Sequence, residues 1–400
     1  MDYISVKEAA EKWNVSKRLV QKYCSSGRID GVRKFSGSWE IPINAPKPQD
    51  PRKNISALSA PFYKTDNDPF SDLMPLMNTS FNPGECTACI TKIKDPQKHA
   101  IALAEFHYFS GHPQKAAQEA ELYLTCNNPA LRLSACLIYG YANLSIGQIH
   151  LAKYALAEIK NTLASTDTKT LHLKAMEAFA TITAYVLLHI PLPEDLPPIN
   201  DLLPELPIGI RMFALYVYAH YLYLNKQYQK SIGIAQATFA MVGKQQYPIP
   251  AIYLHLVLVM DYMSLKETEL AKKHLLTAWD IARPDDLIEG FGEHHGLLGG
   301  MLEAVIKPNW PLDFKRIISI TYSFSHGWRK IHNPVTGHIV ADNLTTTEFA
   351  TAMLAARGWT NQEIGDHMNI SHNTVKKHIS TAMGKLGITR RQDLKKYMLQ

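Results

Sequence analysis

The chain has 400 residues, of which 46% are hydrophobic and 20% are charged, a composition that favours folded domains over disorder. This length predicts roughly two to four domains. Five cysteines exclude a disulfide scaffold, and the most apolar stretch, residues 251–265, is too short to cross a bilayer. The first residues lack the basic and apolar regions of a signal peptide, so we expect a soluble, cytoplasmic protein with no membrane partner.

The formal net charge of +6 is distributed unevenly along the chain. Residues 1–53 contain 11 basic and 6 acidic side chains, a net charge of +5, and residues 342–400 contain 8 and 5, a net charge of +3. The residues between them contain 23 and 25, a net charge of −2. Cationic ends on a nearly neutral middle predict that the ends bind a polyanion and that the middle has another role.

The first 24 residues have the pattern of a helix-turn-helix. Ser5 and Glu8 are spaced as a capping box, in which two side chains satisfy backbone amides at a helix start. Asn14 suits the tight turn that follows, and Val20 should point into the core. The start of the second helix would meet base edges in the DNA major groove. The residues predicted to do so are Ser16, Lys17, Arg18, Gln21 and Lys22.

Residues 27–42 predict a two-stranded hairpin, because apolar residues flank a Ser-Gly turn. The segments GRIDG at 27–31 and WEIP at 39–42 make residues 3–42 resemble the excisionase/MerR-type winged helix-turn-helix. This resemblance implies that the helix at 17–25 contacts bases and that the hairpin, called the wing, contacts phosphates. The wing residues predicted to contact DNA are Arg28, Arg33 and Lys34. A wing that contacts a protein remains an alternative.

The helix-turn-helix pattern recurs near the C-terminus at an offset of 355 residues. Thr360 and Glu363 have capping-box spacing, Gly365 suits a close helix crossing, Asn369 suits the turn and Val375 the core. The next helix offers His, Asn and Lys side chains, which are suitable donors and acceptors for base edges. Two matched units and the charge distribution favour DNA contact over a basic helix face that is merely solvated.

The stretches at 344–348, 358–365, 370–379 and 385–390 resemble the LuxR/FixJ-type DNA-binding domain over about 50 residues. The resemblance implies a four-helix module that dimerises through its last helix, roughly Arg391 to Met398. Thr347 stands where this family usually has Arg, and Gly384 lies inside a helix, at a cost of about 1 kcal/mol relative to Ala. The DNA-contacting residues predicted for this domain are Thr360, Ser371, His372, Asn373, Thr374, Lys376, Lys377, Ser380, Lys385 and Arg390.

The middle of the chain begins with a proline-rich segment. Residues 46–82 predict a linker, with an extended stretch at 71–82 whose apolar side chains could dock on the next domain. From about residue 95 the pattern becomes helical. Four segments align on residues 111, 147, 226 and 266, each as helix, short turn and helix, and prolines between 191 and 207 interrupt a further repeat. This pattern resembles tetratricopeptide repeats, so we expect a helical solenoid.

A solenoid offers a concave face for a peptide, a protein or a small molecule. Candidate residues for such a pocket are Tyr216, Tyr218, His220, Tyr221, Tyr253 and Tyr262. Aromatic residues at helical spacing also suit a packed core, which is the alternative interpretation.

Three candidate motifs in the sequence lack the spacing of a catalytic, metal or cofactor site. Cys86 and Cys89 lack a second ligand pair nearby, and Glu293-His294-His295 lacks the spacing that places two imidazoles on one helix face. The glycines between 290 and 300 are not followed by Lys and Ser or Thr, so they do not form a phosphate loop. We therefore expect no enzyme activity and no cofactor.

The sequence thus predicts a mainly α-helical protein. Its expected domains are a winged helix-turn-helix at 1–45, a linker with a docking segment at 46–82, a tetratricopeptide-like sensor or scaffold at 83–335 and a LuxR-type domain at 340–400. The predicted function is sequence-specific transcription regulation, with double-stranded DNA as partner, a homodimer formed through the C-terminal helix, and a ligand or protein sensed by the middle. The alternative is a peptide- or protein-binding helical adaptor tethered to DNA.

Overall fold

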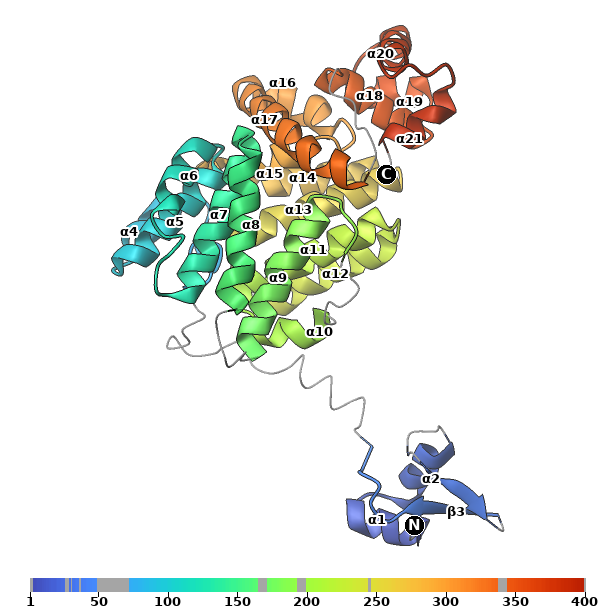
Figure 1. Ribbon diagram of the computed structural model, residues 1–400. Helices are drawn as coiled ribbons and strands as arrows, with labels where there is room; N and C mark the ends of the chain where they lie inside the picture. The colour runs from blue at the N-terminus through green and yellow to red at the C-terminus, as the bar shows by residue number, and fades with distance from the viewer. Residues whose placement is uncertain are drawn as a thin grey trace. The chain divides into compact units, whose positions relative to one another are not determined.

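The computed structural model describes residues 3–25, 29, 31–35, 37–48, 72–164, 171–192, 199–243, 246–336 and 344–398. The chain forms two compact units, Met1–Tyr63 and Lys64–Gln400. The described residues are mainly helical, with one small sheet in the first unit (Figure 1). Most of the predicted linker, residues 49–71, lies outside the described residues. None of the described helices combines the length and apolar character needed to span a membrane.

The first unit contains two helices and a three-stranded antiparallel sheet with the strand order β1-β3-β2. Its elements are β1 (Tyr3–Ser5), α1 (Val6–Trp13), α2 (Lys17–Ser25), β2 (Arg33–Phe35) and β3 (Ser38–Pro42). The hairpin predicted at 27–42 is formed by β2 and β3, with Phe35 opposite Ser38. Strand β1, which the sequence analysis did not predict, pairs with β3 through Ile4 and Ile41.

Local sequence explains how the first unit turns from α1 to α2. The Ser5 hydroxyl accepts a hydrogen bond from the Glu8 amide, and the Glu8 carboxylate accepts one from the Ser5 amide, so the predicted capping box is confirmed. Asn14 adopts the left-handed conformation at φ 49°, as expected for Asn in this turn. Val20 is fully buried in a core that includes Trp13 and Ile41.

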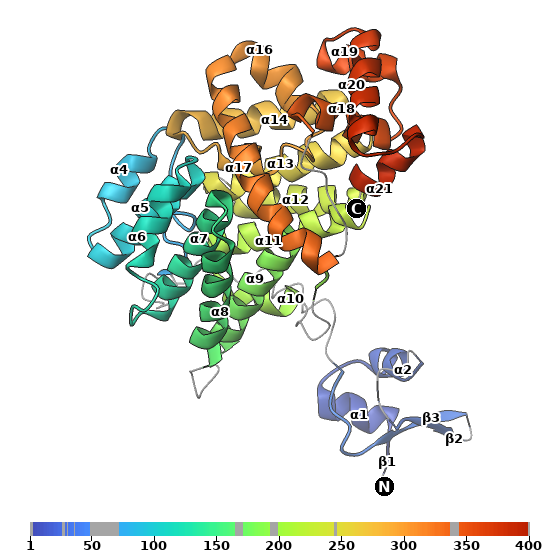
Figure 2. The same ribbon diagram turned by 45° about the horizontal axis from the view of Figure 1, so that its top comes forward.

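The second unit is built from antiparallel helix pairs (Figures 1 and 2). Its first helices are α4 (Cys86–Thr91), α5 (Pro96–Phe109), α6 (Pro113–Glu121), α7 (Pro129–Ile146), α8 (Ile149–Ala164), α9 (Leu171–Leu187), α10 (Ile199–Leu202), α11 (Ile208–Leu224), α12 (Tyr228–Val242), α13 (Pro248–Ser264) and α14 (Thr268–Ala282). We call residues 72–336 the helical body.

Four helix hairpins occur where the repeat pattern predicts them. They are α5–α6, α7–α8, α11–α12 and α13–α14, and the two helices of each hairpin pack against one another. Each turn contains one residue with positive φ, namely Gly111, Gly147, Lys226 and Lys266. These are the four positions on which the segments align in the sequence, so the predicted turns are confirmed.

The segment before α4 packs into the helical body. Residues 72–78 form turns rather than the extended structure that the sequence predicted, and Leu73, Met74, Leu76, Met77 and Phe81 are all buried. The buried Glu105 carboxylate on α5 accepts hydrogen bonds from the backbone amides of Leu76 and Met77, both at 2.9 Å. Such pairing satisfies amides that would otherwise be buried without partners.

The body ends in short helical turns and one long helix. These elements are α15 (Glu289–Glu293), a π-helical turn (Leu302–Ile306), α16 (Lys307–Asn309) and α17 (Pro311–Thr336), and α17 packs against α7 and α15. We call the following helices the C-terminal domain: α18 (Thr346–Ala356), α19 (Asn361–Met368), α20 (His372–Lys385) and α21 (Lys395–Met398), which a 3₁₀ turn at Arg391–Leu394 precedes. The expected single last helix is therefore a 3₁₀ turn followed by one α-helical turn.

Candidate DNA-binding surface and junction cavity

The C-terminal domain contains a helix-turn-helix formed by α19 and α20. Thr360 and Glu363 form the predicted capping box, and Asn369 has a left-handed backbone at φ 54°. The Ser371 hydroxyl accepts a hydrogen bond from the Thr374 amide at 3.1 Å and so caps α20. A Cβ atom on Gly365 would lie 2.7 Å from the Ile370 carbonyl oxygen, which explains the glycine at this helix crossing.

The predicted DNA-contacting residues at the start of α20 and its cap Ser371 lie together on one exposed surface. The exposed members are Ser371, His372, Asn373, Lys376, Lys377 and Ser380, whereas Thr374 is half-buried. On the opposite side of the helix, Val375 and Ile379 are buried in the domain core. The helix therefore presents hydrogen-bonding and cationic side chains outward, as a helix that enters the major groove requires.

The other predicted residues of this domain lie outside that surface. Thr360 is exposed at the start of α19, and Arg390 is exposed and pairs with Asp393 at 3.3 Å. Lys385 donates to the Glu348 carboxylate at 2.7 Å, which ties the end of α20 to α18. The ammonium group of Lys385 therefore has a structural partner within the domain.

In the first unit, all five predicted residues are exposed: Ser16 directly before α2, and Lys17, Arg18, Gln21 and Lys22 on it. On the hairpin, Lys34 is exposed, and the Arg33 guanidinium pairs with Glu40 at 2.8 Å and stacks on the Tyr3 ring at 4.0 Å. Arg28 lies outside the described residues. The described hairpin thus presents two cations, one of which has a partner on the neighbouring strand.

The C-terminal domain packs on a glycine-rich loop of the helical body. A Cβ atom on Gly296 would lie 2.5 Å from the Phe349 ring, and one on Gly300 would lie 3.4 Å from Met368. At Gly299, which has φ +62°, a Cβ atom would lie 3.0 Å from the Arg357 guanidinium. The sequence pattern of these glycines does not indicate a phosphate loop. Because they have no side chain, they allow α18 and α19 to approach the body closely.

Polar contacts accompany this packing. The Arg357 guanidinium donates to the Tyr223 hydroxyl and to the Leu297 carbonyl, and the His367 imidazole donates to the Gly299 carbonyl at 3.0 Å. Lys266, at the turn of the α13–α14 hairpin, pairs with the capping-box residue Glu363 at 3.2 Å. The pKa of Glu363 is lowered, first by its hydrogen bond from the Thr360 backbone and then by Lys266.

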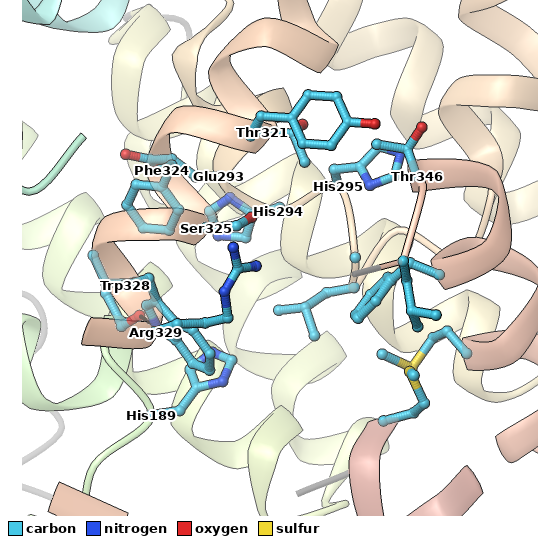
Figure 3. A pocket seen from close by; sticks show the side chains of 18 of the residues that line it. His189, Glu293, His294, His295, Thr321, Phe324, Ser325, Trp328, Arg329 and Thr346 are labelled. Carbon is cyan, nitrogen blue, oxygen red and sulfur yellow. Dashed lines mark hydrogen bonds between the residues drawn. The ribbon is translucent and has the colours of Figure 1, made fainter. Parts of the chain in front are cut away.

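A cavity of about 170 Å³ lies at this junction. The body contributes apolar and polar walls, and the C-terminal domain contributes the opposite wall. The body residues include Tyr141, His189, His220, Glu293, His294, Ser325, Trp328 and Arg329, and the domain residues are Leu344, Thr346, Phe349, Met353, Tyr397 and Met398. Figure 3 shows His294, Ser325 and Trp328 on one side of the cavity and Thr346 on the other.

Buried histidines along one wall form a hydrogen-bonded chain. The His294 Nδ1 donates to the Gly290 carbonyl at 2.8 Å, and its Nε2 lies 2.6 Å from the Tyr216 hydroxyl. That hydroxyl lies 3.1 Å from Nδ1 of His220. Burial lowers the pKa of His294 to about 4 and that of His220 well below its ordinary value, so both rings are neutral. Within the described residues, Nε2 of His220 has no hydrogen-bond partner.

A buried carboxyl group lies beside this chain. Glu293 accepts hydrogen bonds from the hydroxyls of Tyr108 and Tyr253, and burial raises its pKa. Burial likewise raises the pKa of Glu289, one helical turn earlier. The adjacent His189 has a left-handed backbone at φ 53°, and burial lowers its pKa to about 3. Strained backbone and shifted pKa values are frequent at functional sites.

The six residues predicted from sequence to line a ligand pocket lie in different places. His220 lines the junction cavity, and Tyr253 lines a smaller cavity of about 50 Å³ that shares Glu293 with it. Tyr221 lines a third cavity, beside His189 and Arg357. Tyr216 and Tyr262 are buried. The Tyr216 hydroxyl forms a hydrogen bond with His220, and the Tyr262 hydroxyl accepts a hydrogen bond from Gln236. Tyr218 stacks on Tyr221.

Most residues of the junction cavity were not predicted from the sequence, because its wall comes from α17 and from the C-terminal domain. Trp328 and Arg329 lie one helical turn beyond Phe324 and Ser325, a spacing that places them on one face of α17. This shared face of α17 was the sequence signal that could have indicated these cavity residues. Similarly, the glycines at 296, 299 and 300 were recognised only as lacking a nucleotide-binding motif.

Comparison with known proteins identifies one part of the chain. Residues 342–398 match the family model of the bacterial regulatory proteins of the luxR family. No curated protein and no solved structure matches the chain. The match confirms the resemblance seen in the sequence of this domain. The C-terminal domain is therefore a LuxR-type helix-turn-helix domain, which supports DNA-binding transcription regulation as the general function of the chain.

Proposed function

We propose that the chain is a sequence-specific transcription regulator whose C-terminal domain binds an operator through α20. The observation that carries this proposal is the continuous exposed surface of α20 within a domain that matches the luxR family. His372 and Asn373 at the helix start would contact base edges, and Lys376 and Lys377 would contact guanine or phosphate. Packing of the domain on the body leaves this surface exposed.

The other parts of the chain have supporting roles in this proposal. The first unit acts as a winged helix-turn-helix that adds a second DNA contact through α2 and Lys34. The helical body, a tetratricopeptide-like scaffold, senses a ligand or partner and sets the position of the DNA-binding domain. Two copies associate through the C-terminal helix, and the protein acts in the cytoplasm without catalysing a reaction.

The first test is selection of duplexes from a random DNA library with the full-length chain, followed by footprinting of the selected site. We expect the variant Lys376→Ala/Lys377→Ala to lose selection of that site while the fold is retained. If both lysines contact phosphate, the dependence of log affinity on log salt should become less steep by about one for each lysine.

The matched control is Lys272→Ala/Lys273→Ala, which removes two exposed lysines from α14 of the body. This control should select the same site with unchanged affinity and salt dependence. An unchanged footprint for the α20 variant would contradict the assignment. For the first unit, Lys17→Ala/Arg18→Ala should shorten the footprint, and an unchanged footprint length would show that α2 does not contact DNA.

A further inference from the structure

The third cavity, which Tyr221 lines, is a cleft to which the body and the C-terminal domain both contribute. The body supplies residues 189–192 after α9 and the turn of the α11–α12 hairpin, and the domain supplies Ala356, Arg357 and two residues of α21. The volume of the cleft is about 730 Å³. Small-molecule sites typically measure about 300–1,000 Å³, so this cleft has room for a small organic ligand.

Three basic side chains give this cavity a positive charge. They are Lys226 at the hairpin turn, Arg357 directly after α18 and Lys395 at the start of α21, and we call the cavity the cationic cleft. None of its described lining residues is Asp or Glu. Burial lowers the pKa of His189, which also lines it, to about 3, so that ring adds no charge. A concave surface with one sign of charge attracts ligands of the opposite sign.

The three cationic groups have no acidic partner among the described residues. Lys226 and Lys395 are exposed and form no ion pair within the described parts of the chain. Arg357 is half-buried, and its guanidinium donates to the Tyr223 hydroxyl and the Leu297 carbonyl, neither of which is a carboxylate. A positive charge that is partly removed from water without a counter-ion is unfavourable, and a bound anion offsets this effect. The cleft therefore favours an anionic ligand.

The remaining walls of the cationic cleft are aromatic and aliphatic. Tyr221 and Tyr228 line it and are half-buried, so both residues remain partly accessible. Ile190, Leu192 and Val335 add aliphatic surface. Covering such surface with an apolar group removes it from water, which stabilises a complex. An inorganic ion would leave these walls uncovered, so they favour an anion that also carries a ring.

We propose that the cationic cleft binds a small aromatic phosphate monoester. The phosphate interacts with the ammonium groups of Lys226 and Lys395 and with the positive field of Arg357, and the ring packs against Tyr221 and Tyr228. A phosphate monoester suits three cations better than a carboxylate does, because it carries about −1.5 to −2 charges near pH 7 and three strong acceptor oxygens.

This ligand links two parts of the chain. It contacts the body through Lys226 and the C-terminal domain through Lys395, and so stabilises the docked arrangement of the two. The resulting change in DNA affinity rests on the proposed DNA-binding function, whereas binding of the ligand itself does not.

The binding test uses the full-length chain without DNA and phenyl phosphate as the probe. Saturation-transfer NMR titration compares it with phenol, which lacks the phosphate, and with benzoate, which has a single charge, and inorganic phosphate is added as a competitor without a ring. We expect phenyl phosphate to bind about tenfold more tightly than phenol, as one hydrogen bond between charged groups implies. It should also bind more tightly than benzoate and than inorganic phosphate. Equal or weaker binding of phenyl phosphate in any of these three comparisons would overturn the proposal.

Lysine variants locate the bound phosphate. Lys226→Gln and Lys395→Gln each remove one charge and keep a polar side chain, and each should weaken phenyl phosphate binding by about fivefold without changing phenol binding. The matched controls are Lys230→Gln on α12 and Lys396→Gln on α21, which remove a lysine near each site but outside the described lining of the cleft. These controls should bind phenyl phosphate like the parent chain. Unchanged affinity in both cleft variants, or equal weakening in the controls, would contradict the assigned site.

A DNA titration separates a ligand site from a further DNA contact. We expect the double variant Lys226→Gln/Lys395→Gln to bind the selected duplex like the parent chain when no ligand is present. If the cleft contacted DNA phosphates instead, this variant would bind the duplex more weakly, and its salt dependence would become less steep by about one for each lysine. That result, together with no preference for phenyl phosphate over phenol, would overturn the proposal.

A coupling measurement separates this site from the proposed function. Phenyl phosphate at saturating concentration should change the duplex affinity of the parent chain by at least about threefold, a coupling of ordinary allosteric size. If phenyl phosphate is preferred over phenol but no duplex is selected, the DNA-binding function fails and the ligand site stands. If a duplex is selected but phenyl phosphate is not preferred, the ligand site fails. Unchanged duplex affinity with phenyl phosphate bound would contradict the regulatory effect alone.

Discussion

At the scale of single residues, the local sequence best explains the backbone conformation of the two asparagines at the helix turns. Asn14 and Asn369 both have left-handed backbones, at φ 49° and 54°, and both were predicted from a short local motif. The motif suffices because Asn tolerates this conformation better than most residues with a Cβ atom. By contrast, the contact between Tyr216 and His294 could not be predicted, because Tyr216 lies on α11 and His294 directly follows α15, far away in sequence.

The turn conformation gives a stability prediction for the C-terminal domain. Asn369→Ala should lower the free energy of unfolding by about 1 kcal/mol, because Ala is strained in a left-handed conformation. Asn369→Gly should be near neutral, since Gly adopts the same backbone without strain. Chemical denaturation of the full-length variants, followed by circular dichroism, measures both effects. Equal stability of the Ala and Gly variants would show that backbone strain does not govern this position.

At the scale of elements, the turns of the body hairpins were predictable, whereas the packing between hairpins was not. The four aligned segments each end a helix at a residue with positive φ, a signal contained within a few residues. Strand β1 was missed because only three residues form it, and it pairs with β3, more than 30 residues later. The close contact of Gly296 with Phe349 was also not predicted, because Phe349 belongs to the C-terminal domain and is distant in sequence.

Substitution by alanine should change the stability of the C-terminal domain in opposite directions at two glycines, Gly365 in α19 and Gly384 in α20. Gly384 lies within α20 with no atom near the position of an added Cβ, so Gly384→Ala should stabilise the domain by about 1 kcal/mol. At Gly365 an added Cβ would lie 2.7 Å from the Ile370 carbonyl oxygen, so Gly365→Ala should destabilise it by about 1–3 kcal/mol. Thermal unfolding of the two variants measures both signs, and a loss of stability in Gly384→Ala would contradict the role assigned to helix propensity.

At the scale of the whole molecule, the position of the DNA-binding domain depends on side chains from three places. The glycines of the loop at 296–300 leave space for the domain, Lys266 at a hairpin turn pairs with Glu363, and Arg357, directly after α18, donates to Tyr223 of α11. Every one of these contacts joins the C-terminal domain to the second half of the body. The contact of Lys266 with Glu363 reaches the first turn of α19.

Buried ionisable groups make the stability of the second unit depend on pH in both directions. Burial lowers the pKa of His189 and His255 to about 3, while the unfolded chain takes up these protons near pH 6.5, so acidification below about pH 6.5 destabilises the fold. Burial raises the pKa of Glu105 and Asp261 to about 8, while the unfolded chain releases these protons near pH 4, so stability falls as the pH rises toward 8. We expect maximal stability of this unit near pH 5–6.

Asp261 allows the alkaline side of this profile to be tested alone. Its side chain is fully buried on α13, and this burial raises its pKa to about 8 against the opposing effect of the nearby Ser231 hydroxyl. Asp261→Asn cannot ionise, so between pH 5 and 8.5 it should retain stability, on the order of a few kcal/mol, that the parent chain loses. Denaturation at a series of pH values measures this, with the exposed Asp280→Asn on α14 as the control that should follow the parent. A variant that loses stability as steeply as the parent would mean that Asp261 is already ionised in the fold at pH 5, because a group contributes to the slope only where the fold holds a proton that the unfolded chain has released.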